Sequence, residues 1–228
     1  MNSGPLHPDR ELIIGVTPGA RPDGRLVVAL CRAGALGVLD AGRDPSRARA
    51  EMALVSDRHG GPFGVRLGAR AGLGPDDLPR AVDTVVVADA EVNLVGPHRL
   101  AGRRVLAEVT TLAEARSALA AGGHGLVAKG AESGGRVGEE MAFVLLQRLV
   151  AAVDGPIWLL GGIGLDTAAA AIVGGARGVV LDAQLALARD ASLPPDVRAA
   201  IAGMDGSETV VVGGHRLFAR PDLDLPAP

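Results

Sequence analysis

The sequence contains one lysine, one cysteine and no tyrosine, and each shortage excludes a class of protein. Aromatic residues make up 2 % of the 228 residues, too few for the stacking platforms that bind single-stranded nucleic acid. Cys31 is alone, so the chain has no internal disulfide and no cysteine metal cluster, and we expect no metal site. No apolar run approaches the roughly 18 residues of a membrane-spanning helix, and the N-terminus lacks a signal-peptide core. We therefore expect a cytoplasmic protein without a membrane partner.

Charge is carried by arginine and carboxylates, with a formal net charge of −3 that gives no reason to expect a nucleic-acid partner. Lysine and arginine total 23, so one lysine leaves 22 arginines. Because the chain uses arginine wherever else it needs a cation, the single Lys129 stands out as a candidate functional residue.

Short apolar runs alternate with helical segments along the chain, which predicts a parallel sheet covered by helices. About eight βα units within roughly 200 to 250 residues favour closure into a barrel. The open-sheet alternative lacks support, since the turn after the first strand does not fit G-x-G-x-x-G. We predict a single-domain (β/α)8 TIM barrel over residues 11–204, with 205–228 as a C-terminal extension or linker that holds one more strand-like run. The expected strands are 11–18, 36–42, 63–68, 84–90, 104–111, 125–130, 157–162 and 178–187.

The helices between these strands are expected from helical spacing, and the fourth connection, around 93–102, stays unassigned. The segment 138–153 is predicted to be the longest of them. The expected helices are 23–35, 45–60, 74–82, 112–123, 138–153 and 165–175.

A glycine-rich turn, "GGIG", follows the seventh expected strand, where barrels commonly bind phosphate. Glycines let backbone N–H groups approach an anion, and the following helix N-terminus adds a favourable dipole. The eighth strand ends at Asp182 and Ala183, and a carboxylate there repels a phosphate dianion. Two plainer interpretations stay open: a turn that binds nothing, and an Asp182 side chain that turns away to pair with an arginine.

Lys129 ends the sixth expected strand, at the mouth of the predicted barrel. Alternation places Val127 and Lys129 on the same face of that strand. A lysine there can donate to a flavin ring, a phosphate or a carboxylate, and Gly134 and Gly135 would let a flat ring lie against bare backbone. Arg66 and Glu108 are further candidates for the mouth, with a structural ion pair as the alternative.

Four segments together resemble the nitronate monooxygenase (2-nitropropane dioxygenase) family of FMN-dependent barrels, over residues 12–190. They are "RAGALGVLDAG", "KGAESGGRVG", "LLGGIG" and "GARGVVLDAQ". The resemblance implies an FMN cofactor whose phosphate lies at the ends of the last two strands and whose ring lies beside the sixth. By that resemblance the phosphate would contact Gly161, Gly162, Ile163, Asp182 and Ala183, and the ring would contact Lys129, Gly134 and Gly135.

The chain departs from the family at two places. Active members carry a catalytic histidine after the double glycine, but this position is Arg136, which cannot accept a proton. The family places a glycine and a small hydroxyl residue where this chain has Asp182 and Ala183. Because the predicted barrel uses nearly all residues of the chain, we expect no helical capping domain among them. The stretch "KGAESGGRVGEEMAFVLLQRL" also resembles flavin barrels of polyketide and polyunsaturated fatty acid synthases, where related barrels act as enoyl reductases.

These observations support three hypotheses. The first is an FMN-binding oxidoreductase that acts on a nitroalkane-like small molecule or a carrier-tethered acyl substrate, with Lys129 and Arg136 stabilising negative charge. The second is a barrel that has lost catalysis and serves as a docking or structural domain beside other domains of a larger synthase. The third is a sugar-phosphate isomerase with Asp89 and Glu108 as acid and base.

Overall fold

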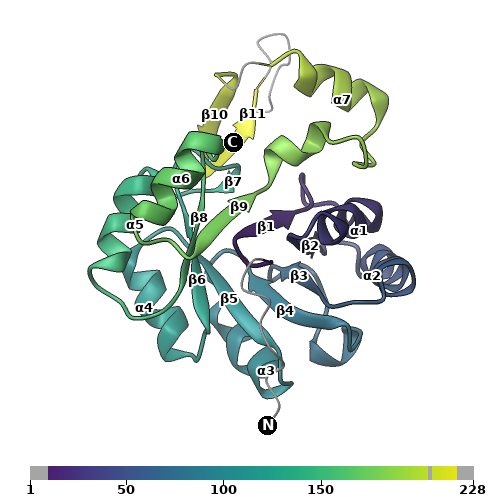
Figure 1. Ribbon diagram of the computed structural model, residues 1–228, viewed down its shortest axis with the longest axis horizontal. Coiled ribbons are helices and arrows are strands. Elements are labelled where there is room, and N and C mark those ends of the chain that lie inside the picture. Colours follow the sequence, from purple (N-terminus) through teal and green to yellow (C-terminus); the bar gives the residue numbers. More distant parts are fainter. Residues whose placement is uncertain (1–9, 205–206, 220–228) are drawn as a thin grey trace.

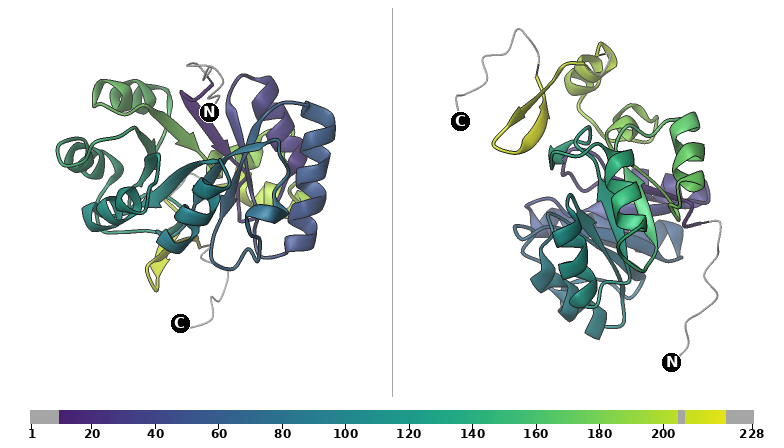
Figure 2. Two further views of the ribbon diagram at one scale, coloured as in Figure 1. Left: turned by 90° about the horizontal axis from the view of Figure 1, so that it is seen from below. Right: turned by 90° about the vertical axis from the view of Figure 1, so that its left-hand side faces the viewer.

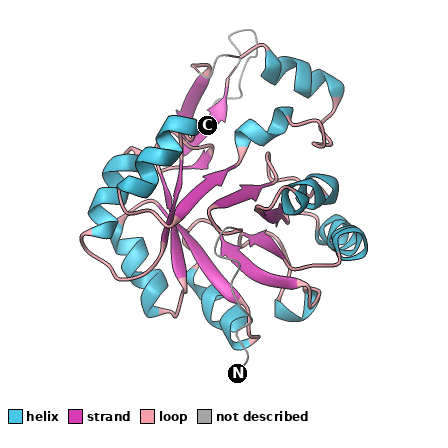
Figure 3. Ribbon diagram, viewed as in Figure 1, coloured by secondary structure: helices cyan, strands magenta, loops and turns pink. Residues whose placement is uncertain are grey.

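In the computed structural model, which describes residues 10–204 and 207–219, eight parallel strands close into a barrel surrounded by helices (Figures 1 and 3). The last barrel strand pairs with the first, since Leu181 lies opposite Gly15, so the described sheet has no open edge. This confirms the predicted (β/α)8 barrel. The strands of the barrel are, in order, β1 (Ile13–Val16), β2 (Leu36–Asp40), β3 (Phe63–Leu67), β4 (Val82–Val87), β5 (Arg104–Val109), β6 (Gly125–Lys129), β8 (Ile157–Leu160) and β9 (Gly178–Leu181).

Seven α-helices and three short 3₁₀ helices occupy the connections of the described chain. None of the described helices is long and apolar enough to cross a membrane. The α-helices are α1 (Gly24–Arg32), α2 (Pro45–His59), α3 (Val95–Leu100), α4 (Leu112–Ala120), α5 (Ala142–Val150), α6 (Leu165–Val173) and α7 (Pro195–Ala202). The 3₁₀ helices are η1 (Pro75–Asp77), η2 (Val92–Leu94) and η3 (Ala183–Leu187).

Three expectations about these connections were wrong. The segment 74–82 forms only η1, because Pro79 lacks an N–H and Leu78 before it is extended. The residues after β9 turn into η3 instead of continuing the strand to 187. The longest described helix is α2, with 15 residues, while α5 has nine.

The late start of α5 has a local cause. Both carboxylate oxygens of Glu132 lie 3.1 Å from the backbone N of Ala142, the first residue of the helix. The carbonyl of Glu140 accepts a hydrogen bond from the Ala131 N–H, which holds the preceding residues in a loop. A side chain from the β6–α5 loop therefore caps this helix and fixes where it begins.

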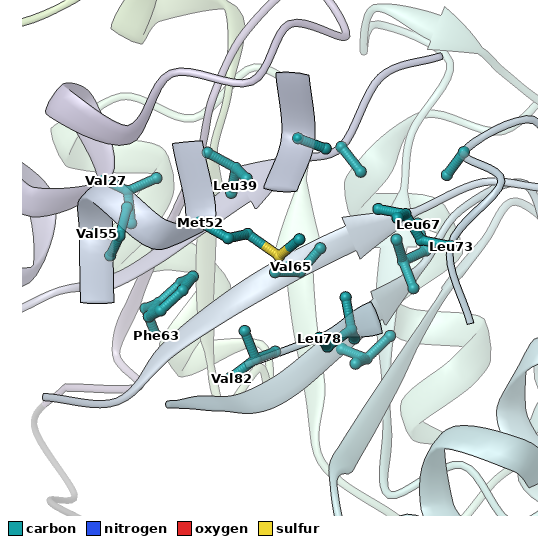
Figure 4. Packing of buried hydrophobic residues seen from close by; sticks show 14 of the residues in the cluster. Val27, Leu39, Met52, Val55, Phe63, Val65, Leu67, Leu73, Leu78 and Val82 are labelled. Atoms are coloured by element: carbon teal, nitrogen blue, oxygen red, sulfur yellow. The ribbon is translucent and has the colours of Figure 1, made fainter. Parts of the chain in front are cut away.

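Apolar packing occurs on both sides of the barrel wall. One outer cluster lies between α1, α2 and the strands β2 to β5, with Met52 and Phe63 fully buried (Figure 4). A second lies between α4 to α6 and the strands β5, β6, β8 and β9, with Leu145 and Leu149 fully buried. Inside the barrel an apolar interior layer fills the space; its residues are Ile14, Val16, Leu36, Val38, Val86, Leu106, Val127, Trp158, Leu160 and Val180.

The C-terminal segment forms a β-hairpin that stands off the barrel body (Figure 2, right). Strands β10 (Thr209–Val212) and β11 (His215–Phe218) pair antiparallel through a turn at Gly213 and Gly214, both with positive φ. Strand β11 also pairs with β7 (Gly135–Arg136), a two-residue strand in the β6–α5 loop. The sequence predicted one strand here and the structure has two, while the Pro-rich stretch 220–228 lies outside the described residues. The boundary at 205 stays a prediction.

Candidate functional site

The carboxyl ends of the barrel strands carry a ring of charged residues above the apolar interior layer. Side chains alternate along a strand, so the residue two places beyond an interior residue also points inward. Asp40 follows Val38 in this way, and Lys129 follows Val127. Glu108 likewise follows Leu106, and strand pairing places Arg66 opposite Asp40. The alternation along the strand that places Lys129 on the same face as Val127 therefore also applies to the other charged residues at these strand ends.

Arg66 is the centre of this charged layer. Its Nε and Nη2 donate to the two carboxylate oxygens of Glu108 at 2.6 and 2.8 Å, and its Nη1 donates to Asp40 Oδ2 at 2.8 Å. Lys129 Nζ lies 3.7 Å from Glu108 Oε2. Glu108 and Lys129 are 3 % and 4 % exposed, so these charges are shielded from water. We call Asp40, Arg66, Glu108 and Lys129 the mouth cluster.

The electrostatics of the mouth cluster follow from burial and pairing. Burial alone would raise the pKa of Glu108, but the Arg66 guanidinium and the Lys129 ammonium outweigh it and lower that pKa to about 2. Burial raises the pKa of Asp40, because its single contact with Arg66 compensates less. Burial opposes the charge of Arg66, yet Glu108 and Asp40 hold its pKa above the usual value. The sequence left a structural ion pair open for Arg66 and for Glu108, and each does form one, with the other as its partner.

The glycine pair of the β6–α5 loop lies beside Lys129, with Gly135 as the nearer of the two. Gly135 has a φ of +75°, and a Cβ placed on it would lie 3.5 Å from Lys129 Nζ. A Cβ on Gly134 would meet no atom within 4 Å. Beside them, buried Ser133 donates to the Leu160 carbonyl at 3.0 Å and ties the loop to β8. Bare backbone therefore faces the one ammonium group of the described mouth.

Arg136 joins three loops at the rim. Its Nη2 lies 2.9 Å from Glu114 Oε1 at the start of α4, and its Nε lies 3.6 Å from Asp89 Oδ1 after β4. Glu114 also accepts hydrogen bonds from the backbone N–H and hydroxyl of Thr110. Asp89 itself has a φ of +54°, an uncommon conformation for a residue with a side chain. Arg136 thus holds the loops after β4, β5 and β6 together.

The proposed phosphate position lies where β8 and β9 end. Gly161 and Gly162 have φ values of +130° and +59°, and Gly161 is packed so closely that a Cβ would come 2.9 Å from Ser133 Oγ. A Cβ on Gly162 would lie 3.7 Å from Glu132 Oε1, so a carboxylate already lies against this glycine. The two glycines let other groups approach the backbone of this turn closely, but the group that lies against it is the Glu132 carboxylate.

Side chains bridge the same two strand ends. Gln184 Nε2 donates to the Ile163 carbonyl at 3.1 Å, and its Oε1 accepts from the Asp182 N–H at 3.2 Å. The Gly164 N–H donates to Thr167 Oγ1 at 2.6 Å. Burial raises the pKa of Asp182, although the Ala183 N–H and the Lys129 ammonium stabilise its carboxylate.

The structure brings Lys129, Gly134, Gly135 and Arg136 to one side of the mouth and Gly161, Gly162, Ile163, Asp182 and Ala183 to another. Their roles stay predictions. Sequence reasoning overlooked Asp40 and the bridging Gln184. Asp40 was detectable, because it lies two residues beyond the inward-facing Val38. The bridge formed by Gln184 had no sequence signal, since it depends on how two strand ends meet.

No protein-family model matches the chain. Among curated proteins it is 30 % identical over 219 residues to a (3aS,4S,5R,7aS)-5-hydroxy-7a-methyl-1-oxo-octahydro-1H-indene-4-carboxyl-CoA dehydrogenase of Mycobacterium tuberculosis, covering 88 % of this chain and 59 % of that protein. It is 27 % identical over 210 residues to the enzyme of the same name from Rhodococcus jostii, covering 86 % of this chain and 56 % of that protein. The chain therefore spans less than two thirds of these relatives.

Solved structures extend the comparison to the barrel itself. FabK (M276A mutant) from Thermotoga maritima has a TM-score of 0.81 at 26 % identity, covering 92 % of this chain and 74 % of that one. A nitroalkane oxidase from Streptomyces ansochromogenes has a TM-score of 0.70 at 26 % identity, covering 82 % and 69 %. The molecule thus shares its (β/α)8 barrel with these two structures. These structures confirm the resemblance to nitronate monooxygenase-like barrels that the sequence motifs indicate.

The residues of the mouth fit one end of FMN and not the other. Bare backbone at Gly134 and Gly135, with the Lys129 ammonium beside it, fits a flat ring that gains negative charge. The phosphate end does not fit a dianion, because Asp182 and Glu132 lie there and side-chain acceptors already occupy the N–H groups of Gly164 and Asp182. The arrangement supports a ring site with a poor anion site beside it.

Proposed function

We propose that the chain is a flavin-binding barrel of oxidoreductase type, acting on a nitroalkane-like small molecule or a carrier- or CoA-linked acyl substrate. The observation that carries the proposal is the bare backbone of Gly134 and Gly135 beside the buried Lys129 ammonium, at the carboxyl ends of the strands. The names of the matched proteins, a nitroalkane oxidase and carboxyl-CoA dehydrogenases, support both substrate classes. We further propose a cytoplasmic location, without nucleic-acid or membrane partners.

The residues around the ring site suggest how charge would be managed. A flavin, when bound, supplies the electron or hydride transfer, and the protein supplies orientation and charge. Lys129 is held by Glu108 and lies beside Gly135, so its ammonium is aimed without a large rotation. A preorganised cation of this kind stabilises negative charge on a ring or an enolate-like substrate. The Arg136 guanidinium lies at the rim, paired with Glu114 and Asp89.

The proposal is tested by flavin binding to the purified full chain, measured by absorbance and fluorescence. We expect a flavin to bind, and we expect Gly135→Asp to weaken binding by at least roughly tenfold, because the new carboxylate would cover Lys129. The matched control is Gly102→Asp in the loop before β5, at the opposite end of the barrel. Gly102 also has a positive φ, +79°, and open space around it. Equal effects of the two changes would contradict the proposal.

One observation favours the second hypothesis, a docking or structural domain of a larger synthase. Arg136, at the position of the family's histidine, is ion-paired to Glu114 and Asp89 and ties the loops together. Arg136→His separates the two functions. If the variant binds flavin and oxidises a nitronate, the site retains oxidoreductase geometry. If neither the parent chain nor the variant binds any flavin, the docking function is favoured.

A further inference from the structure

The strand ends that hold a phosphate in related barrels are occupied here by groups of the protein itself. Three acceptors converge on them: the Asp182 carboxylate, the Gln184 carboxamide oxygen and the Thr167 hydroxyl. The Gln184 oxygen accepts a hydrogen bond from the Asp182 N–H at 3.2 Å, and the Thr167 hydroxyl accepts one from the Gly164 N–H at 2.6 Å. The Ala183 N–H stabilises the Asp182 carboxylate. Three backbone N–H groups at these strand ends, those of Gly164, Asp182 and Ala183, are thus already used.

The carboxylates near these strand ends also disfavour a phosphate, because they carry the same sign of charge. A second carboxylate, that of Glu132, lies against Gly162 from the β6–α5 loop and is itself held by the Ala142 N–H. Two cations of the mouth are engaged elsewhere, since Arg66 is bound to Asp40 and Glu108, and Arg136 to Glu114. The third, Lys129, already compensates the Asp182 and Glu108 carboxylates. Placing a phosphate dianion beside Asp182 and Glu132 adds like charges in a partly buried position, where repulsion is poorly screened.

The Gln184 side chain also connects the two strand ends. Its carboxamide spans from the Asp182 N–H after β9 to the Ile163 carbonyl after β8. A phosphate would have to displace that amide, whereas a neutral hydroxyl can both donate to Asp182 and accept from an N–H group. This end of the site is therefore complementary to a ligand that ends in a neutral, hydrogen-bonding group.

We propose that the site selects a flavin whose side chain ends in a neutral hydroxyl over one that ends in a phosphate, with Asp182 as the specificity-determining residue. This inference rests on the proposed flavin-binding function and names the chemical class of ligand for the same site. Burial already raises the pKa of Asp182, which shows that one negative charge here is unfavourable and a second would be more so.

The test compares riboflavin and FMN, titrated into the full chain and followed by flavin fluorescence. We expect the parent chain to bind riboflavin at least as tightly as FMN. Asp182→Gly should tighten FMN by at least roughly tenfold while leaving riboflavin within about threefold, because it removes a like charge. Asp182 has a φ of −135°, so neither glycine nor asparagine strains the backbone there, and Asp182→Asn serves as the second, isosteric variant.

Asp190→Asn, which removes an exposed carboxylate after η3, is the matched control and should change neither affinity. The inference is overturned if the parent chain prefers FMN by tenfold or more, or if both Asp182 variants leave the ratio of the two affinities unchanged. In either case the flavin-binding function still stands. If no variant binds either flavin, the function fails and the inference fails with it.

Discussion

The interior of the barrel has two layers that lie only two residues apart along the same strands. In the lower layer Leu106 and Val127 pack against Trp158, and the Trp158 indole N–H is satisfied by the Glu11 carbonyl at 2.7 Å. In the upper layer the Glu108 carboxylate forms ion pairs with both Arg66 and Lys129. The comparison shows that facing inward does not decide the chemistry of a residue in this barrel. Position along the strand decides it.

The two layers also hold together for different reasons. The lower layer gains stability by removing apolar surface from water, and each contact is replaceable by another of similar shape. The upper layer must offset the cost of taking charges out of water, and it does so only while every charge keeps its partner. Stability in the lower layer is therefore distributed, whereas in the upper layer it depends on Glu108, which contacts both cations.

The largest effect should come from removing that shared partner. Glu108→Ala leaves Arg66 and Lys129 buried beside one weaker acceptor, and we expect a loss of about 3 to 5 kcal/mol in the free energy of unfolding. Urea denaturation followed by circular dichroism measures it. Glu139→Ala, at an exposed carboxylate, should stay within about 0.5 kcal/mol of the parent chain. A loss at Glu108 as small as this would mean that the upper layer is not organised around it.

A somewhat smaller loss is expected in the lower layer. Leu106→Ala removes a fully buried side chain and should cost about 2 to 5 kcal/mol, depending on how far the neighbours relax into the cavity. Leu100→Ala, at a leucine that is 90 % exposed, is the control and should be nearly neutral. Because no charge is involved, the loss in unfolding free energy at Leu106 should be the same at neutral and acidic pH. A loss that changes with pH would mean that the two layers do not differ in this way.

Acid should distinguish the layers further. The folded-state pKa of Glu108 is lowered to about 2, below its ordinary value of 4.5, so its carboxylate stabilises the fold above pH 4.5. That contribution is lost as the pH falls from 4.5 through 2. Asp40 has the opposite sign, because burial raises its pKa and protonation relieves that cost as the pH falls. Glu108→Gln should therefore flatten the acid limb of stability against pH, whereas Leu106→Ala should shift the curve without changing its shape.

The smallest effect is expected at the rim. Arg136 is partly exposed, and its pairs with Glu114 and Asp89 are accessible to solvent, so Arg136→Ala should cost no more than about 1 kcal/mol. That difference should shrink at high salt, when the unfolding free energies are compared at two ionic strengths. A loss in unfolding free energy comparable to that at Glu108 would mean that Arg136 belongs to the buried upper layer and not to the rim.

Much of the barrel could be predicted from local pattern. Each strand appears as a short apolar run, and alternation correctly placed Val127 and Lys129 on one face of β6. One wrong prediction, a helix over 74–82, failed for a local reason, the proline at position 79. Two others concern places where a group elsewhere in the chain sets the local outcome. The start of α5 depends on the Glu132 carboxylate, and the second strand of the C-terminal hairpin pairs with β7, about 80 residues earlier. Such contacts leave no periodic trace in the sequence.

The amino-acid sequence by itself determined the eight strands of the barrel and placed Val127 and Lys129 on one face of β6, because these depend only on backbone periodicity. Tertiary structure decided that Arg66 binds Glu108 and Asp40 together, and that Gln184 joins the ends of β8 and β9. Barrel closure and strand register bring those groups within hydrogen-bond distance. Sequence spacing carries no information about either.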